Sequence, residues 1–166
     1  MPAMSVTLDS RPGRAAVLAS RAVVAGVFVW AAIPKILDPA QFAESIANYH
    51  LLPGAMVGPL AAGLPVLELV VAAALLLGVQ ARGAALVAIA LLVVFAGGMA
   101  QAILRGIDLD CGCFGAATRA QVTWWSVARN AGLSAAACVV AVGPEVDLRG
   151  LFSRRKGAPP TQPLVP

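Results

Sequence analysis

Charged residues are scarce in this sequence. Only 12% of its 166 residues are Asp, Glu, Lys or Arg, whereas a soluble domain usually carries about 25%. Apolar residues make up 60% of the chain and fall in long blocks, unlike the short alternating runs of a soluble core. The composition therefore excludes an ordinary soluble domain and predicts an integral membrane protein. The length allows one compact helical unit and hardly a second.

Histidine and cysteine are also rare. His50 is the only histidine, and the three cysteines are Cys111, Cys113 and Cys138. A structural zinc site takes four ligands. Cys111 and Cys113 could supply only half of such a site, so metal binding is the weakest interpretation of these thiols, and no metal is predicted. Cys138 lies inside the last apolar stretch, and we interpret it as a small packing residue. The basic residues flank apolar segments, so the net charge of +4 indicates membrane topology and no binding of nucleic acid.

Four apolar stretches are each close to the ~20 residues that a helix needs to cross a bilayer. Because every backbone polar group inside lipid needs an internal partner, we expect these stretches to be helices. The first is longer than the ~7–15 apolar residues of a signal peptide and contains Arg21, so we interpret it as a retained helix. The expected spans are residues 15–33, 54–79, 84–104 and 123–142.

The parts of the chain outside these spans are expected to differ in structure. Residues 1–14 and the proline-rich residues 144–166 are predicted to be disordered tails around a domain at 15–143. The segment 34–39 is expected to end the first helix, with Asp38 as the N-cap of a new helix and Pro39 at its first position. A short amphipathic helix on the membrane surface is then predicted from an apolar stripe. The stripe consists of Phe42, Ile46 and Tyr49.

Basic residues predict the orientation of the helices. A cytoplasmic N-terminus leaves seven basic residues on the inner side: Arg11, Arg14, Arg82, Arg149, Arg154, Arg155 and Lys156. Three then lie on the outer side: Lys35, Arg105 and Arg119. The bias predicts that both termini are cytoplasmic and that the amphipathic helix and the third connection are extracytoplasmic. Thiols can form disulfides there, whereas the cytosol keeps them reduced.

The third connection contains Cys111 and Cys113, separated by Gly112. A disulfide between residues two apart closes a small, strained ring, which the missing side chain of glycine makes feasible. Strained, exposed disulfides are typically labile or catalytic. We therefore interpret the pair as a redox-active dithiol that exchanges with a partner's cysteines. A static disulfide and two idle thiols are the alternatives, beside the metal site mentioned above.

Charged residues inside the spans are a second candidate site. They are Arg21 in the first span, Glu68 in the second and Arg129, beside Asn130, in the fourth. Each costs at least ~2.5 kcal/mol if unpaired at the bilayer centre, so each should face the bundle interior. At ~1.5 Å per residue, Glu68 lies near mid-depth, between Arg129 on the outer side and Arg21 on the inner side. Glu68 is expected to pair with one of them, either as a clasp that fixes helix packing or as part of a proton or substrate pathway.

Three residues at the predicted outer interface allow two interpretations each. Lys35 at the end of the first helix is interpreted as a snorkelling anchor, and the alternative is a cation near the thiol loop. Trp124 and Trp125 are interpreted as aromatic-belt anchors, and the alternative is that they flank a cofactor ring. The polar cluster beneath the dithiol motivates one hypothesis for a cofactor, a quinone bound near Trp124, Arg129 and Glu68.

A set of segments in a fixed order carries a family resemblance. They are Arg21 with Phe28, Lys35-Ile36-Leu37-Asp38-Pro39, Tyr49-His50-Leu51-Leu52-Pro53, Leu64-Pro65-Val66-Leu67-Glu68, Asp110-Cys111-Gly112-Cys113-Phe114-Gly115 and Arg129-Asn130. In this order the chain resembles the methylamine-utilisation protein MauE family, within the DoxX-like membrane proteins. The resemblance covers about residues 14–142, and the segment around the two cysteines is its most specific part.

The resemblance implies an all-α bundle of four transmembrane helices in the bacterial inner membrane. It also implies a role in the maturation of disulfide-rich extracytoplasmic proteins, notably the small subunit of methylamine dehydrogenase, alongside a thioredoxin-like partner. Cys111 and Cys113 would be the redox pair. The supporting polar residues would be Lys35, Glu68, Arg105 and Arg129, to which Arg21 and Asn130 are added from their positions in the spans. A non-enzymatic assembly subunit, a small transporter or metal-handling protein, and a homo-oligomer are alternatives that the sequence leaves open.

Overall fold

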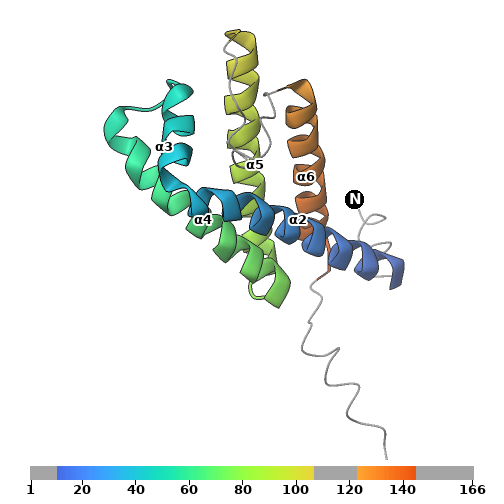
Figure 1. Cartoon of the computed structure of the whole chain (residues 1–166). Coiled ribbons are helices and arrows are strands. Elements are labelled where there is room, and N and C mark those ends of the chain that lie inside the picture. The colour runs from blue at the N-terminus through green and yellow to red at the C-terminus, as the bar shows by residue number, and fades with distance from the viewer. Residues whose placement is uncertain (1–10, 107–122, 145–166) are drawn as a thin grey trace, which may run out of the picture.

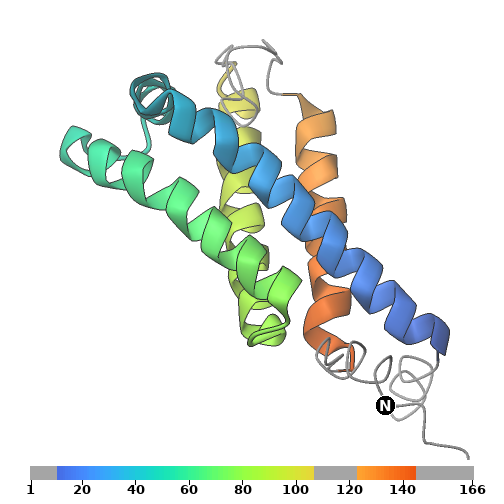
Figure 2. The same ribbon diagram turned by 60° about the horizontal axis from the view of Figure 1, so that its bottom comes forward.

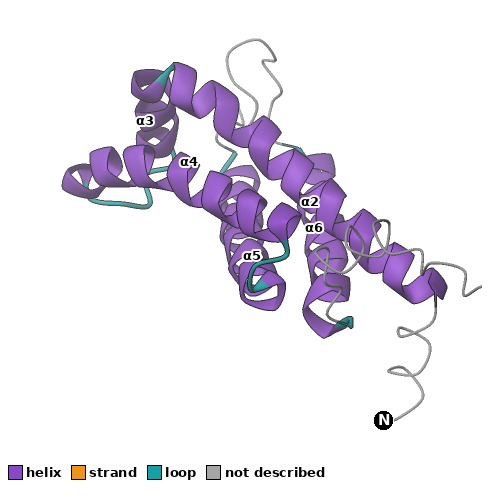
Figure 3. Cartoon of the chain, turned by 90° about the horizontal axis from the view of Figure 1, so that it is seen from below, coloured by secondary structure: helices purple, strands orange, loops and turns teal. Residues whose placement is uncertain are grey.

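The computed structural model describes residues 11–106 and 123–144. All regular secondary structure in these ranges is helical (Figure 3). Four of the helices are long and apolar enough to cross a membrane, so the expected all-α membrane bundle with a short additional helix is confirmed. The helices are α2 (Arg11–Leu37), α3 (Pro39–Asn48), α4 (Gly54–Leu77), α5 (Ala81–Leu104) and α6 (Trp124–Val142).

The long helices form two antiparallel pairs. Helix α2 packs along α4, α5 packs along α6, and α2 crosses α6 obliquely to join the pairs (Figures 1 and 2). The start of α2, the turn between α4 and α5 and the end of α6 lie at one end of the bundle. Helix α3 lies at the other end, where α5 ends and α6 begins. We call this second end the α3 end.

The first helix is longer than the sequence suggests. It continues through Pro34, four residues beyond the expected span 15–33, and ends at Leu37, within the segment 34–39 that was predicted to end it. Proline disrupts mainly the turn before it, and the backbone N–H of Asp38 still bonds to the carbonyl of Pro34 at 3.0 Å. The Asp38 side chain then accepts a hydrogen bond from the backbone N–H of Gln41 at 2.9 Å. This confirms the expected N-cap, with Pro39 in the first turn of α3.

Arg21 connects α2 to the end of α4. Its side chain is 3% exposed, and its Nε donates a hydrogen bond of 2.8 Å to the carbonyl of Leu75. The last carbonyls of a helix lack intrahelical partners and carry partial negative charge, which favours a cation there. Gly78 follows with a φ of +75°, and a Cβ at this position would lie 2.7 Å from Nη2 of Arg21. The glycine therefore provides both the left-handed turn and the space for the guanidinium group.

The core of the bundle consists mainly of small residues. Alanines and valines with little or no exposure lie where the helices meet, and such residues let helix backbones approach closely in membranes. They include Val24, Ala25, Ala32, Val71, Ala72, Ala85, Ala88 and Ala137. Among the larger apolar side chains, Phe28, Leu75, Leu92 and Met99 are buried, but many others point outward toward lipid. The most exposed include Leu37, Leu77, Leu86, Val94, Leu104 and Trp125.

Candidate functional site

A buried ion pair joins α2 to α4 near the α3 end of the bundle. Lys35, in the last turn of α2, is 4% exposed, and Glu68, near the middle of α4, is 2% exposed. The Lys35 ammonium donates a hydrogen bond to Oε1 of Glu68. Glu68 therefore pairs with Lys35, and the expectation that it pairs with Arg21 or Arg129 is wrong.

The interpretation of Lys35 as a snorkelling anchor is also wrong. An anchor keeps its ammonium group in water, but here α2 continues past Pro34 and carries Lys35 inward. Helix α3 then packs against α2 and α4, and its one buried residue, Phe42, covers the lysine. Helix α2 extends about one turn beyond the C-terminal end expected from the sequence. This extra turn contains Lys35 and determines that its side chain faces protein instead of solvent.

Two aromatic rings complete the surroundings of the ammonium group. Nζ of Lys35 lies 5.1 Å from the centroid of Phe42, on α3, and 5.2 Å from that of Phe95, on α5. Both distances are within the ~6 Å range of a cation–π interaction, worth about 2 kcal/mol when the cation is desolvated. One lysine thus connects α2, α3, α4 and α5. Neither ring could be assigned to this site from the sequence, since an aromatic residue in an apolar helix has no pattern that identifies its partner.

A small cavity lies on one side of the ion pair, between α2, α4, α5 and α6. Its volume is about 40 Å³, which exceeds the ~10–15 Å³ that one water requires. Oε2 of Glu68 is buried and has no hydrogen-bond partner among the residues that the structure describes. Arg129 and Asn130 line the same cavity, so four of the six predicted polar residues converge here: Lys35, Glu68, Arg129 and Asn130. The complete lining is Val27, Phe28, Ala31, Lys35, Glu68, Leu92, Phe95, Arg129, Asn130 and Leu133.

Asn130 is held in place by its own helix. It is 7% exposed, and its side-chain amide donates a hydrogen bond of 3.2 Å to the carbonyl of Ser126. Its backbone carbonyl accepts a hydrogen bond of 2.9 Å from the hydroxyl of Ser134. Both bonds lie within α6, and the first orients the Asn130 amide relative to its own helix.

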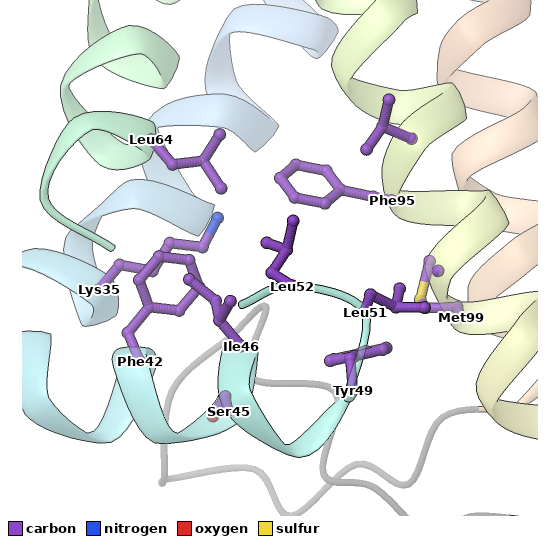
Figure 4. Close-up of a pocket in the computed structure, with 12 residues that line it drawn as sticks. Lys35, Phe42, Ser45, Ile46, Tyr49, Leu51, Leu52, Leu64, Phe95 and Met99 are labelled. Carbon is purple, nitrogen blue, oxygen red and sulfur yellow. The ribbon is translucent and has the colours of Figure 1, made fainter. Parts of the chain in front are cut away.

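A larger apolar pocket lies on the other side of the ion pair. It has a volume of about 130 Å³ and is enclosed by α3, the segment 49–52, α4 and α5 (Figure 4). Lys35 and Phe95 line this pocket as well as the small cavity, so the ammonium group lies between the two spaces. The lining residues are Lys35, Phe42, Ser45, Ile46, Tyr49, Leu51, Leu52, Leu64, Val94, Phe95, Gly98 and Met99.

The remaining predicted site residues that the structure describes do not join this group. Cys111 and Cys113 lie outside the described residues. Arg105 is exposed at the end of α5. Trp124 and Trp125, at the start of α6, are 57% and 75% exposed, and neither lines the two spaces. The hypothesis of a quinone held near Trp124 is therefore not supported by the position of this side chain.

Cys138 and Arg21 lie in surroundings that differ from those expected from the sequence. Cys138 is exposed on α6, so its interpretation as a packing residue is wrong. A position deep in an apolar helix can face lipid as well as protein, and the sequence pattern around Cys138 did not distinguish the two. Arg21 caps the end of α4 through its bond to Leu75, and does not contribute to the ion pair.

Comparisons with known proteins place the chain in one family. The family model described as methylamine utilisation protein MauE matches residues 13–143, a range that contains all five helices except the first two residues of α2. The chain is 39% identical over 126 residues to the methylamine utilization protein MauE of Paracoccus denitrificans, covering 75% of this chain and 68% of that protein. It is 42% identical over 120 residues to the protein of the same description from Paracoccus versutus, covering 72% and 64%.

A third relative gives a shorter match. The chain is 46% identical over 91 residues to the methylamine utilization protein MauE of Methylophilus methylotrophus, which covers 54% of this chain and 48% of that protein. The chain thus spans between about half and two thirds of the length of these relatives. No solved structure matches.

Proposed function

Because the chain belongs to the methylamine utilisation protein MauE family, we propose that it assists the maturation of an extracytoplasmic, disulfide-containing protein, as part of methylamine utilisation. In this proposal Cys111 and Cys113 exchange disulfides with a thioredoxin-like partner. The chain resides in the bacterial cytoplasmic membrane with both termini in the cytoplasm. The observation that carries the proposal is the spacing of the two thiols, which are one glycine apart in an otherwise thiol-poor chain.

The position of the neighbouring residues supports this proposal. In the sequence the thiols lie between the end of α5 and the start of α6, and both of these helix ends are at the α3 end of the bundle (Figures 1 and 2). Arg14 and Arg82 belong to the opposite end, and basic residues favour the cytoplasmic side. An orientation with the α3 end outside the cytoplasm exposes the thiols to a compartment where disulfides persist.

The proposed exchange is a two-step thiol–disulfide reaction. The thiolate of one cysteine attacks a sulfur of the partner's disulfide, forms a mixed disulfide and releases the other partner sulfur as a thiolate. The second cysteine then attacks the mixed disulfide, which yields a Cys111–Cys113 disulfide and a partner dithiol. Two electrons pass to the partner in this direction. The reverse direction proceeds through the same intermediate and oxidises the partner.

Trapping of the mixed disulfide tests the proposal. One of the two cysteines forms the mixed disulfide and the other releases the partner, so either Cys113→Ser or Cys111→Ser should accumulate a covalent complex in cells. A reducing agent should dissolve this complex, and mass spectrometry identifies the trapped protein. Cys138→Ser is the matched control, because it removes a thiol that is exposed on a membrane helix. The exchange proposal is wrong if neither loop variant traps more protein than this control.

A further inference from the structure

The apolar pocket beside Lys35 opens toward lipid. Helices α4 and α5 meet at their shared turn and diverge toward the α3 end, where α3 and the segment 49–52 fill the space between them (Figure 1). Val94 lies near the middle of α5, lines the pocket and is 70% exposed. A membrane span has hydrocarbon around its middle. The pocket is therefore accessible to molecules dissolved in the bilayer.

The size and lining of the pocket favour a single ring. Its volume of about 130 Å³ is close to the 150 Å³ of an engineered apolar cavity that binds benzene. Aromatic side chains approach from three segments, with Phe42 on α3, Tyr49 just after it and Phe95 on α5 (Figure 4). Aromatic pairs gain from offset or edge-to-face contacts beyond the area that they bury. A six-membered ring matches this environment.

The ammonium group of Lys35 specifies the polar part of the ligand. An ammonium group has three N–H donors, and here one bonds to Glu68 while the group also lines the pocket. The remaining donors favour a ligand with an acceptor oxygen. Because Glu68 already neutralises the lysine, an anionic ligand would add an uncompensated buried charge, which is costly. The acceptor should therefore be neutral, as a carbonyl oxygen is.

From these observations we propose that the pocket binds the head group of a lipid-soluble quinone, with one carbonyl oxygen accepting a hydrogen bond from Lys35. The ring lies among Phe42, Tyr49 and Phe95, and the tail leaves past Val94 into the bilayer. This site differs from the one considered from the sequence, because neither Trp124 nor Trp125 lines it. The proposal concerns binding alone and does not depend on the chemistry of Cys111 and Cys113.

Photoaffinity labelling tests the site. The purified full chain in lipid nanodiscs is labelled with an azido-benzoquinone that carries a decyl tail, and the labelled peptides are mapped by mass spectrometry. Labels are expected on residues 42–52 and 94–99. An excess of the unmodified decyl-benzoquinone should suppress them, whereas decylbenzene, which has the ring and the tail but no oxygen, should not. Equal suppression by both competitors would show an apolar cavity filled by any lipid-soluble chain and would overturn the proposal.

Two adjacent glycines provide a matched pair of variants. A Cβ at Gly98 would lie 3.9 Å from Leu51 and from the ring of Tyr49, so Gly98→Leu fits at its Cβ and fills the pocket with the rest of its side chain. Gly97 is exposed and has nothing within 4 Å of such a Cβ, so Gly97→Leu adds the same side chain on the lipid face. We expect at least a tenfold loss of labelling for Gly98→Leu and no loss for Gly97→Leu. Equal labelling of the two variants contradicts the location of the site.

A double variant tests the hydrogen bond. Lys35→Met with Glu68→Gln removes both charges together, which folded proteins tolerate better than the loss of one. Competition by decyl-benzoquinone should weaken by about tenfold, because a hydrogen bond from a charged donor is lost. Decylbenzene should compete as weakly as before. An unchanged affinity of the double variant for the quinone would show that Lys35 does not bind the ligand.

Discussion

Removal of one partner of the Lys35–Glu68 ion pair should destabilise the bundle strongly. Both side chains are almost completely buried, so each single substitution leaves the other group without its counter-charge. A buried pair broken in this way typically costs about 3–5 kcal/mol. Glu68→Gln leaves an ammonium group supported by the rings of Phe42 and Phe95, and one such contact with a desolvated cation offsets about 2 kcal/mol of the loss. We therefore expect each single variant to lose several kcal/mol in its free energy of unfolding.

The double variant Lys35→Met/Glu68→Gln should be more stable than either single variant. Replacing both members of a buried ion pair with well-packed hydrophobic residues of similar volume is often neutral; here Gln keeps the length of Glu, and Met is one atom shorter than Lys. A double-mutant cycle isolates this coupling. The free energy of unfolding is measured in detergent micelles from the loss of helical circular dichroism during titration with SDS. Arg105→Gln is the control and should change it by less than about 0.5 kcal/mol, because Arg105 is exposed.

Two results would refute this reasoning. Single variants that lose less than about 1 kcal/mol would mean that water reaches the pair, since exposed ion pairs contribute only about 0–1 kcal/mol. A double variant that loses the sum of the two single losses would mean that the two side chains do not interact.

Other predictions concern the opposite end of the bundle and the topology. Gly78→Ala should lower the free energy of unfolding by at least about 1 kcal/mol, because Gly78 has a positive φ and an added Cβ would lie 2.7 Å from Arg21. Gly83→Ala is the control, because Gly83 is exposed at the start of α5 and an added Cβ there has no neighbour within 4 Å. It should leave the free energy of unfolding equal or raise it by up to about 1 kcal/mol. Arg21→Met should also lower the free energy of unfolding, by about 1.5–3 kcal/mol, because the hydrogen bond to Leu75 is lost. A decrease no larger than that caused by Arg105→Gln would contradict the role of Arg21 as a cap of α4. The topology is tested in intact cells with a membrane-impermeant maleimide and variants that lack the native cysteines. The reagent should label Asn48→Cys, at the α3 end, and should not label Gln80→Cys, at the α4–α5 turn. The opposite labelling pattern would show that the proposed orientation is reversed.

The sequence predicts the fold well because lipid restricts the alternatives. Only helices satisfy the backbone inside a bilayer in a chain of this kind, so apolar length alone locates four spans to within a few residues. The N-cap at Asp38 was also predictable, because the Asp-Pro pair is a local signal that does not depend on tertiary contacts.

The site was only partly predictable. Burial cost correctly indicated that Glu68 needs a partner, but the choice of partner depends on how far α2 continues past Pro34 and on how α3 folds over Lys35. The depth of each residue in the membrane, counted along its helix, indicates neither of these features. That depth alone predicted Arg21 or Arg129 as the partner of Glu68. The pocket formed by Phe95 and Gly98 likewise arises from the angle between α4 and α5, which no local pattern in the sequence specifies.

The redox state of the two loop cysteines in growing cells tests the central claim most directly. Rapid acid quenching followed by alkylation with a heavy maleimide separates the reduced chain from the oxidised chain by mass, in a Cys138→Ser background that leaves only Cys111 and Cys113. A pair that exchanges disulfides should be present in both forms, and an added reductant or oxidant should shift the ratio and let it recover after removal. A pair that stays fully oxidised throughout would be a static disulfide and would contradict the proposed exchange.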